Sequence, residues 1–408
     1  MQVMYARCAG IDIGKDVLVA AIRIQNGSVQ RLCRTFRTTR AQLLSMAAWF
    51  ESVGITDVVM EATGSYWKAI WHVLEGRFGL TLANPAQVKN LPGRKSDVND
   101  ATWLADLHAH GLIRGSFVPT PDIAAMRELT RTRKQFVREV NRHTLRIQKI
   151  LDVAGLKITG PISEILGVSG RRIVKALIAG ETNSERLADL VDPHVRATRR
   201  EIIEALQGQL TAQQRRLLKM HLHLIENLEA DIGQIDHDIQ KAVKPFRAVV
   251  ERVMEIPGFS DVSAPALLAE IGVDMTRFPT AGHLISWARL CPRLDESAGK
   301  VRSRKTLKSA AWVKTLVTQA AMSAIRTRNS YYRAQYFRIR ARRGTNKAIV
   351  AVAASLLATA YHVIRDHKPY RDLGADYFQR RDTDRIVRQS VARLKKAGYA
   401  VTLTREVA

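Results

Sequence analysis

The sequence has 408 residues, 46% hydrophobic and 25% charged, a globular composition that excludes a mostly disordered basic protein. Its 64 Lys and Arg outnumber its 38 Asp and Glu, and the net charge of +26 predicts a phosphate-rich partner. Three scattered cysteines argue against disulfides and structural zinc. The sequence also shows no signal peptide and no apolar run long enough to span a bilayer, so we expect a cytoplasmic protein without a membrane partner.

The first 115 residues alternate short apolar segments with amphipathic ones. We predict strands at 7–13, 17–24, 28–36, 58–61 and 80–83, and helices at 39–52, at 66–74 and after Ser96 as N-cap. Three strands followed by alternating helix and strand indicate an α/β domain at 1–115.

Residues 116–250 have a helical pattern that predicts a helical, coiled-coil linker and oligomerisation region. After Pro121, cations recur every three to four residues and so share one face of a helix: Arg127, Arg131, Lys134, Arg138, Arg142 and Arg146. This face is either solvated or contacts nucleic acid. A second long helix at 211–243 has a heptad-like apolar seam, which favours a helical hairpin or a dimer contact.

The last third is predicted to be α-helical, with one domain at 251–375 and a helix-and-strand tail at 376–408. Residues 255–272 resemble a helix-hairpin-helix element, in which the turn at Gly258 either approaches a phosphate or is an ordinary corner between helices. Further helices are expected at 281–290, 307–328, 330–343 and 346–366, then a helix at 385–396 and a short strand at 398–403.

The positive charge is concentrated in one part of the chain. Residues 1–115 contain 13 Lys and Arg against 9 Asp and Glu, whereas residues 297–365 contain 15 Lys and Arg and no acid. Solubility requires only mixed charges, so a segment without a carboxylate favours a polyanion-binding surface.

Four acids occupy unusual places in the α/β region. Asp12 lies in the middle of an apolar strand, Glu61 ends another strand, and Asp97 and Asp100 are spaced to share one face of a helix. Each alone is also explained as a polar strand residue or a helix N-terminal charge. Together they have the layout of RNase H-like nucleases, which bind two Mg²⁺ ions on such carboxylates.

Several motifs resemble those of DEDD-type transposases of the insertion-sequence-110 family. The N-terminal motifs are GIDIGKD around Asp12, VVMEATGSYW around Glu61 and NPAQVKNLPGRKSDVNDATWLADL around Asp97 and Asp100. The C-terminal motifs are IPGFSDVSAPALLAEIG, CPRLDESAGKVRSRKTLKSAAWVKTLVTQAA and RARRGTNKAIVAVAASLLATAYHVIRDHKPYRDLG, with AGYAVTL near the end. The resemblance covers nearly the whole chain in the family's order.

The resemblance implies a recombinase of a mobile element with a RuvC-like, RNase H-fold N-terminal domain. It carries over Asp12, Glu61, Asp97 and Asp100 as the Mg²⁺-binding tetrad, and a serine nucleophile that we place at Ser297. Many relatives have Gly directly after this serine, where this chain has Ala298, so the neighbouring Ser303 and Ser309 remain alternatives.

The same resemblance implies donor and target double-stranded DNA as substrates and a structured bridge RNA as guide. It also implies a homodimer or homotetramer in which the acids of one protomer meet the serine of another. It also implies a bacterial, nucleoid-associated location. On residue chemistry, cations near the serine and in the helix at 330–343 are candidates for nucleic-acid contact: Lys300, Arg302, Arg304, Lys305, Arg342 and Arg343.

Two other functions fit the same residues. A RuvC-like, metal-dependent nuclease of structured DNA would use water as nucleophile and need no serine. A non-catalytic scaffold that binds RNA or DNA would keep the acids for structural reasons. In either case Ser297 would be a surface serine.

Overall fold

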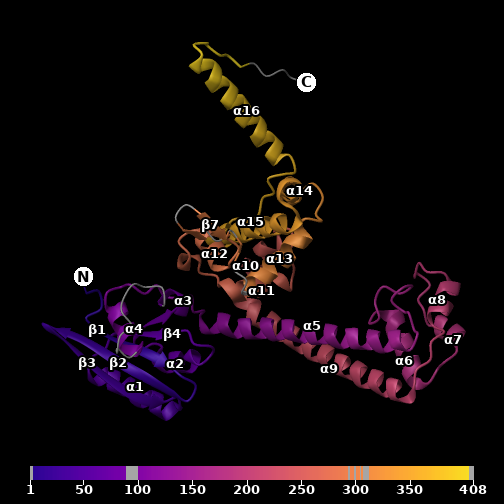
Figure 1. The fold of residues 1–408 in the computed structure, drawn as a ribbon, viewed down its shortest axis with the longest axis horizontal. Helices are drawn as coiled ribbons and strands as arrows, with labels where there is room; N and C mark the ends of the chain where they lie inside the picture. Colours follow the sequence, from indigo (N-terminus) through magenta and orange to yellow (C-terminus); the bar gives the residue numbers. More distant parts are fainter. Residues whose placement is uncertain are drawn as a thin grey trace. The chain divides into compact units, whose positions relative to one another are not determined.

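The computed structural model describes residues 3–88, 100–292, 295–297, 300–303, 305–306 and 312–403. The chain divides into two compact units, unit 1 at Met1–Val118 and unit 2 at Pro119–Ala408 (Figure 1). The predicted order of a mixed α/β region followed by a mostly helical region is confirmed.

Unit 1 contains a five-stranded sheet with the strand order β3-β2-β1-β4-β5. The first three strands pair antiparallel, and β4 and β5 extend the sheet parallel to β1. Gly27 adopts a positive φ of 73° in the tight turn between β2 and β3, a conformation that glycine adopts without strain. The strands are β1 Arg7–Ile13, β2 Val17–Asn26, β3 Ser28–Arg37, β4 Asp57–Glu61 and β5 Gly79–Ala83, and the helices are α1 Arg40–Ser52, α2 Trp67–Leu74, α3 Pro85–Val88 and α4 Asp100–Ala109.

The two faces of this sheet differ because side chains alternate along each strand. On one face, Ala9, Ile11 and Ile13 of β1 join the main apolar core together with residues of α1 and α2. The other face of β1 carries Cys8, Gly10 and Asp12 and is covered by α4. At Gly10 the helix backbone comes so close that a β-carbon would lie 2.2 Å from the carbonyl oxygen of Ala101.

Unit 2 begins with two long helices, α5 Pro121–Val153 and α9 Ala212–Val243. They run antiparallel, since Arg133 contacts Asp236 while His143, farther along α5, contacts His221, earlier in α9. The predicted seam on 211–243 is buried or half-buried along its length. Ile147 and Leu151 share a core with α6 Val168–Ala179, α7 Ser184–Ala188 and α8 Arg199–Ala205. The seam therefore forms a hairpin within the chain.

The remainder of unit 2 is a group of helices with one small hairpin of strands. The strands β6 Asp295–Ser297 and β7 Lys300–Ser303 pair antiparallel, which we did not predict. The predicted strand at 398–403 is wrong, because these residues lie in turn and irregular structure and pair with no strand of the described part of the chain. The helices are α10 Arg247–Met254, α11 Ser263–Ile271, α12 Ala281–Trp287, α13 Trp312–Ala324, α14 Tyr331–Arg343, α15 Thr345–Asp366 and α16 Tyr377–Lys396, with short 3-10 turns η1 Lys244–Phe246 and η2 Met275–Arg277.

Helix α15 is the one helix of the described residues that is long and apolar enough to cross a membrane by length and composition. Half of the apolar 18-residue stretch of this helix is buried in the protein. It packs against α12, α13 and α14, with Leu356, Leu357 and Tyr361 almost completely enclosed. This burial is the behaviour of a core helix.

We expect Gly10→Ala to lower the free energy of unfolding of unit 1 by about 1–3 kcal/mol, because the added methyl group meets the backbone of α4 at Ala101 and Ala105. Urea denaturation of the full chain, followed by tryptophan fluorescence, measures the change. Gly115→Ala is the matched control, since its β-carbon would make only an ordinary contact at 3.7 Å with Thr81. Equal stability of the two variants would contradict the close packing of α4.

Candidate functional site

Asp12 and Glu61 lie side by side on the α4 face of the sheet. β1 and β4 are parallel, with Gly10 opposite Val59 and Ile11 opposite Met60, so the next position along the ladder pairs Asp12 with Glu61. Both side chains are partly exposed. Neighbouring strands are about 4.8 Å apart, so the two carboxylates project from adjacent backbones at the same edge of the sheet.

The register of α4 on β1 brings the start of that helix toward these two acids. Cys8 contacts the carbonyl of Ala105, and Gly10, two residues farther along the strand, lies against Ala101. Asp12 is two residues farther along β1 in the same direction, so it lies toward the start of α4, whose first residue is the exposed Asp100. The fourth predicted acid, Asp97, lies outside the described residues.

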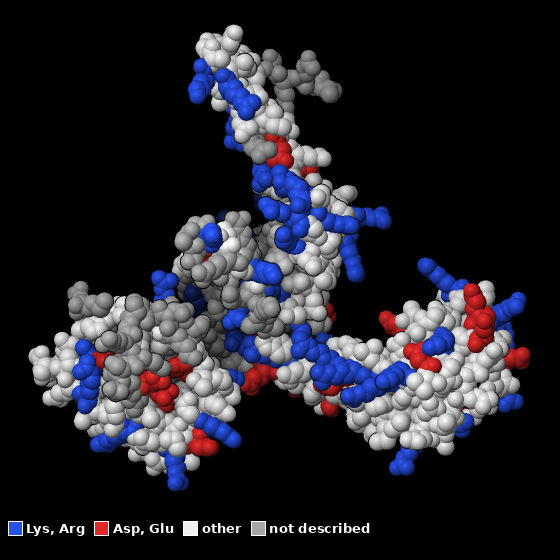
Figure 2. All heavy atoms as spheres, in the orientation of Figure 1, with Lys and Arg blue, Asp and Glu red and all other residues white. Residues whose placement is uncertain are grey.

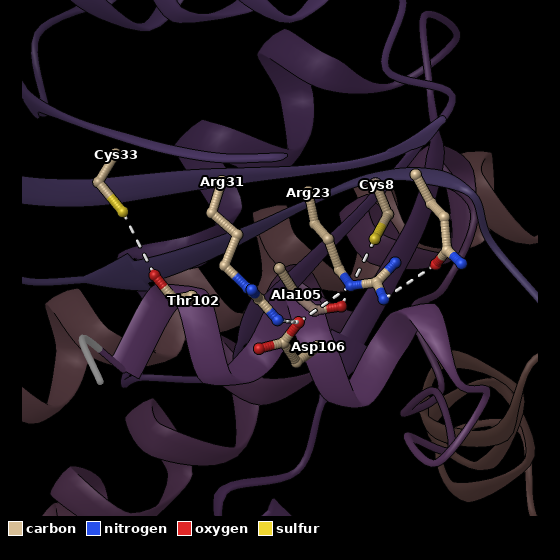
Figure 3. Close-up of polar contacts among 8 residues, drawn as sticks. Cys8, Arg23, Arg31, Cys33, Thr102, Ala105 and Asp106 are labelled. Carbon is tan, nitrogen blue, oxygen red and sulfur yellow. Dashed lines mark hydrogen bonds and ion pairs between the residues drawn. The ribbon is translucent and has the colours of Figure 1, made fainter. Parts of the chain in front are cut away.

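Polar contacts fix helix α4 on the sheet (Figure 3). The buried guanidinium of Arg23 donates to the Asp106 carboxylate at 2.9 Å, and Arg31 donates to the same oxygen at 3.0 Å. The Cys33 thiol and the Thr102 hydroxyl are 3.3 Å apart. A buried cation requires a paired anion, so Asp106 holds α4 in one position along β2 and β3.

Cys8 takes part in the same packing and has no nucleophilic character. Its thiol donates to the Ala105 carbonyl at 3.5 Å. Burial raises the pKa of Cys8 to about 12, and the nearby Arg23 opposes this only in part. The thiol therefore stays protonated at neutral pH.

The donor chemistry of the acids fits a hard divalent cation. Asp12, Glu61 and Asp100 offer only carboxylate oxygens, which Mg²⁺ and similar ions prefer. Within the described ranges, no group of three His, Cys, Asp or Glu is already gathered as a metal site. The two strand acids are neighbours in the sheet, and Asp100 is the first residue of α4.

The predicted serine belongs to the β6–β7 hairpin. The backbone of Ser297 ends β6 opposite Lys300, the first residue of β7. Lys300 and Lys305 are exposed, and Ser303 accepts a hydrogen bond from the Lys305 amide at 3.3 Å. The side chains of Ser297 and Arg302, and the whole of Arg304 and Ser309, lie outside the described part.

Two of the predicted nucleic-acid cations on α5 are engaged within the protein. Arg127 donates to the carbonyls of Ala269 and Glu270 at 2.7 and 3.0 Å, at the C-terminal end of α11. Arg131 forms a two-pronged ion pair with the buried Glu270 carboxylate, at 2.7 and 2.8 Å. Their partners are about 140 residues away in sequence, so no local pattern could have revealed them.

The other α5 cations remain at the surface to different degrees. The ring of Trp312 lies under Arg131, Lys134 and Arg138, at 5.2, 5.8 and 5.3 Å from the ring centroid. Arg142 pairs with Glu139 at 2.6 Å, and Arg146 is exposed. Trp312 was missed by the sequence analysis, because a tryptophan at a helix start has no distinctive spacing.

The predicted cations at the end of α14, Arg342 and Arg343, are exposed. Figure 2 shows Lys and Arg side chains gathered along α5 and over the region of α14. A concentration of cations is the electrostatic property expected of a surface that contacts phosphates.

Comparison with known families gives two matches to transposases. A DEDD transposase model of the IS110 type matches residues 9–155, and a model for transposases of the IS116/IS110/IS902 family matches residues 250–337. The chain belongs to the IS110 family of transposases. No curated protein matches the sequence closely enough to count as a relative.

Membership of the IS110 family indicates the substrate and the general type of cofactor of this transposase. Transposases transfer DNA strands, so its substrate is DNA, and DEDD domains generally use divalent metal ions. Asp12, Glu61 and Asp100 fall within the DEDD match, and Ser297 falls within the second match.

We expect the stability of this transposase to fall as the pH drops below about 6.5, partly because of His108 on α4. Its ring is 2% exposed and stacks on Tyr5, with centroids 4.5 Å apart, and neither ring nitrogen has a hydrogen-bond partner in the described structure. Burial lowers the pKa of His108 below its ordinary value of 6.5, outweighing the opposing effect of Asp57. The unfolded chain then binds a proton that the folded chain excludes, at a cost of at most about 1.4 kcal/mol per pH unit.

The control is His108→Phe, which keeps the stacked ring and removes the titration. Urea unfolding measured between neutral and mildly acidic pH should show a flatter pH dependence for this variant than for the wild type. Parallel curves would show that His108 is not a source of the acid sensitivity.

Proposed function

We propose that this transposase is a recombinase that cleaves and exchanges DNA strands with Ser297 as nucleophile, Mg²⁺ at the acids, and a bridge RNA as guide. The observation that carries the proposal is the pairing of Asp12 and Glu61 at the ends of two adjacent parallel strands, with α4 bringing Asp100 toward them. An antiparallel set of three strands, extended by two parallel strands, also supports an RNase H-like, RuvC-like fold.

Asp12, Glu61, Asp97 and Asp100 would hold the metal, as two Mg²⁺ ions. When bound, such ions neutralise charge on the attacking and leaving oxygens of a phosphodiester. The protein contributes the fixed spacing of Asp12 and Glu61, because both lie on one sheet, and the orientation of Asp100, because Asp106 anchors α4. Rigid supporting elements keep carboxylates in productive positions.

In the proposed reaction, the hydroxyl of Ser297 gives up its proton as its oxygen bonds to a DNA phosphorus atom. The bond from phosphorus to one bridging oxygen breaks, and that oxygen leaves as a hydroxyl with a proton, so the DNA strand is held as a phosphoserine ester. Cations of the hairpin, Lys300, Arg302, Arg304 and Lys305, would stabilise the phosphate oxygens. Attack by another strand's hydroxyl on the ester reverses the process and completes the exchange.

The guide RNA and the oligomer belong to the same proposal. The segment 297–365 has 15 cations and no acids, which supports a role in binding long polyanions. Arg342 and Arg343, which belong to this segment and are exposed at the end of α14, would be part of that binding surface. A dimer or tetramer would place the acids of one protomer beside the serine of another, and a nucleic-acid-bound enzyme would be found with the bacterial nucleoid.

Replacing the acids should abolish cleavage without unfolding the protein. We expect Asp12→Asn, Glu61→Gln and Asp100→Asn each to reduce Mg²⁺-dependent strand cleavage by at least about a hundredfold, because each change removes an anionic ligand. Glu51→Gln is the control, since Glu51 is exposed on α1, on the opposite side of the sheet. Cleavage is measured on labelled DNA with the co-purified RNA, and melting temperatures check folding. Full activity of the acid variants would favour a non-catalytic scaffold.

A covalent intermediate distinguishes the serine mechanism from hydrolysis by water. With a nicked DNA substrate that prevents religation, the wild type should give a protein–DNA adduct that survives denaturing electrophoresis. Ser297→Ala should lose the adduct completely, whereas Ser303→Ala, in the same hairpin, should retain it. Cleavage by the wild type without any adduct would point to the water-using nuclease.

A further inference from the structure

Unit 2 contains a cleft of about 680 Å³ that no part of the proposed catalytic machinery uses. Its walls come from α5, α9, α13 and the turn that leads from α10 into α11. At Gly258 the backbone of this turn packs closely against α13. Gly258 has a positive φ of 98°, and a β-carbon there would lie 2.2 Å from the carbonyl oxygen of Ala320. The turn is therefore a rigid wall of the cleft.

The lining is polar on several sides. Hydroxyl and amide side chains come from α5, α9, α11 and α13: Asn141, Gln240, Ser263, Thr315, Gln319 and Ser323. These groups can donate hydrogen bonds to anionic oxygens, as Ser, Thr, Asn and Gln do at DNA phosphates. The volume is in the range of sites that hold a small group such as one nucleotide unit.

Two cations on α5, Lys134 and Arg138, line the cleft and are held over the ring of Trp312. A cation–π contact leaves their N–H groups able to donate hydrogen bonds. Burial lowers the pKa of Lys134, and the charge of Arg138 lowers it further. A bound anion would relieve this repulsion between the two cations.

The carboxylates of the lining oppose these cations only weakly. Asp236 forms a two-pronged ion pair with Arg133, which neutralises both. Asp261 is exposed at the turn. The cleft therefore presents two cations and one exposed acid to an incoming ligand.

We propose that this cleft binds the phosphodiester backbone of the transposase's DNA, with Lys134 and Arg138 pairing with phosphate oxygens. The inference rests on the proposed function, because it takes DNA as the ligand. α13, which forms one wall, is the next described helix or strand after the hairpin that contains Ser297. Contacts to the backbone alone position a duplex without reading its sequence.

The test measures binding of a short DNA duplex of arbitrary sequence by fluorescence anisotropy over a series of salt concentrations. The double variant Lys134→Ala/Arg138→Ala should bind roughly tenfold more weakly, with a salt slope smaller by about two, one for each lost phosphate contact. Asp261→Asn should bind DNA more tightly than the wild type, a change of opposite sign that general damage to the fold would not produce.

The matched control is Arg216→Ala/Lys219→Ala, which removes the same charge from exposed positions on α9 outside the cleft lining. The proposal would be overturned if the control variant bound DNA as weakly as the cleft variant, or if the salt slope of the cleft variant were unchanged. It would also be overturned if the cleft variant lost affinity only for an RNA duplex probe. Circular dichroism establishes that all variants are folded.

Cleavage assays separate this inference from the proposed function. If Asp12→Asn abolishes cleavage while Lys134→Ala/Arg138→Ala binds DNA as the wild type does, only the cleft proposal fails. If Asp12→Asn leaves cleavage intact, the proposed function fails, whatever the cleft variants show.

Discussion

The arrangement of the candidate active site depends on how closely α4 approaches β1. Helix and strand backbones touch at Gly10, where any side chain would meet Ala101 and Ala105. The Arg23–Asp106 ion pair fixes the helix in that position, and its partly enclosed setting makes a change of register costly. Asp12 lies two residues after Gly10 on β1, and Asp100 lies one residue before Ala101 on α4. The relative position of this strand and helix is therefore set by the contact at Gly10 and by the Arg23–Asp106 ion pair. The acids owe their placement to a glycine and an ion pair that have no chemical role themselves.

The charges of this transposase perform different tasks in different places. The net charge of +26 suggests a uniform attraction for nucleic acid, but part of it stabilises the fold. Arg127 and Arg131 secure α11 through the Ala269 and Glu270 carbonyls and the Glu270 carboxylate, and Arg133 pairs with Asp236. Because a paired cation releases fewer counterions from DNA, the number of Lys and Arg overestimates the binding surface. Exposed groups such as Arg342 and Arg343 are better indicators of it.

Sequence patterns were sufficient for the five strands of unit 1, for helices α1, α2 and α4, and for placing Asp12 within one strand and Glu61 at the end of another. They did not predict α3, nor that these two strands are adjacent and parallel. Gly10 carried a signal that was not used, since a glycine inside an apolar strand often marks a close backbone contact. The strand predicted at 398–403 was wrong because strand propensity has no effect without a pairing partner. The β6–β7 hairpin and the Arg131–Glu270 pair depend on contacts that a local window of sequence cannot contain.

Helix α5 links the two parts of unit 2 because its faces have different partners. Its apolar side packs along α9, while its basic side holds α11 through Glu270 and α13 through Trp312. Trp312 is the first residue of α13, so the ring that lies under Lys134 and Arg138 also fixes the start of that helix. Because a cation–π contact leaves the N–H groups of Lys134 and Arg138 able to donate, a phosphate can bind them while both cations stay over the ring. The same two side chains can therefore pack α13 against α5 and contact the DNA backbone.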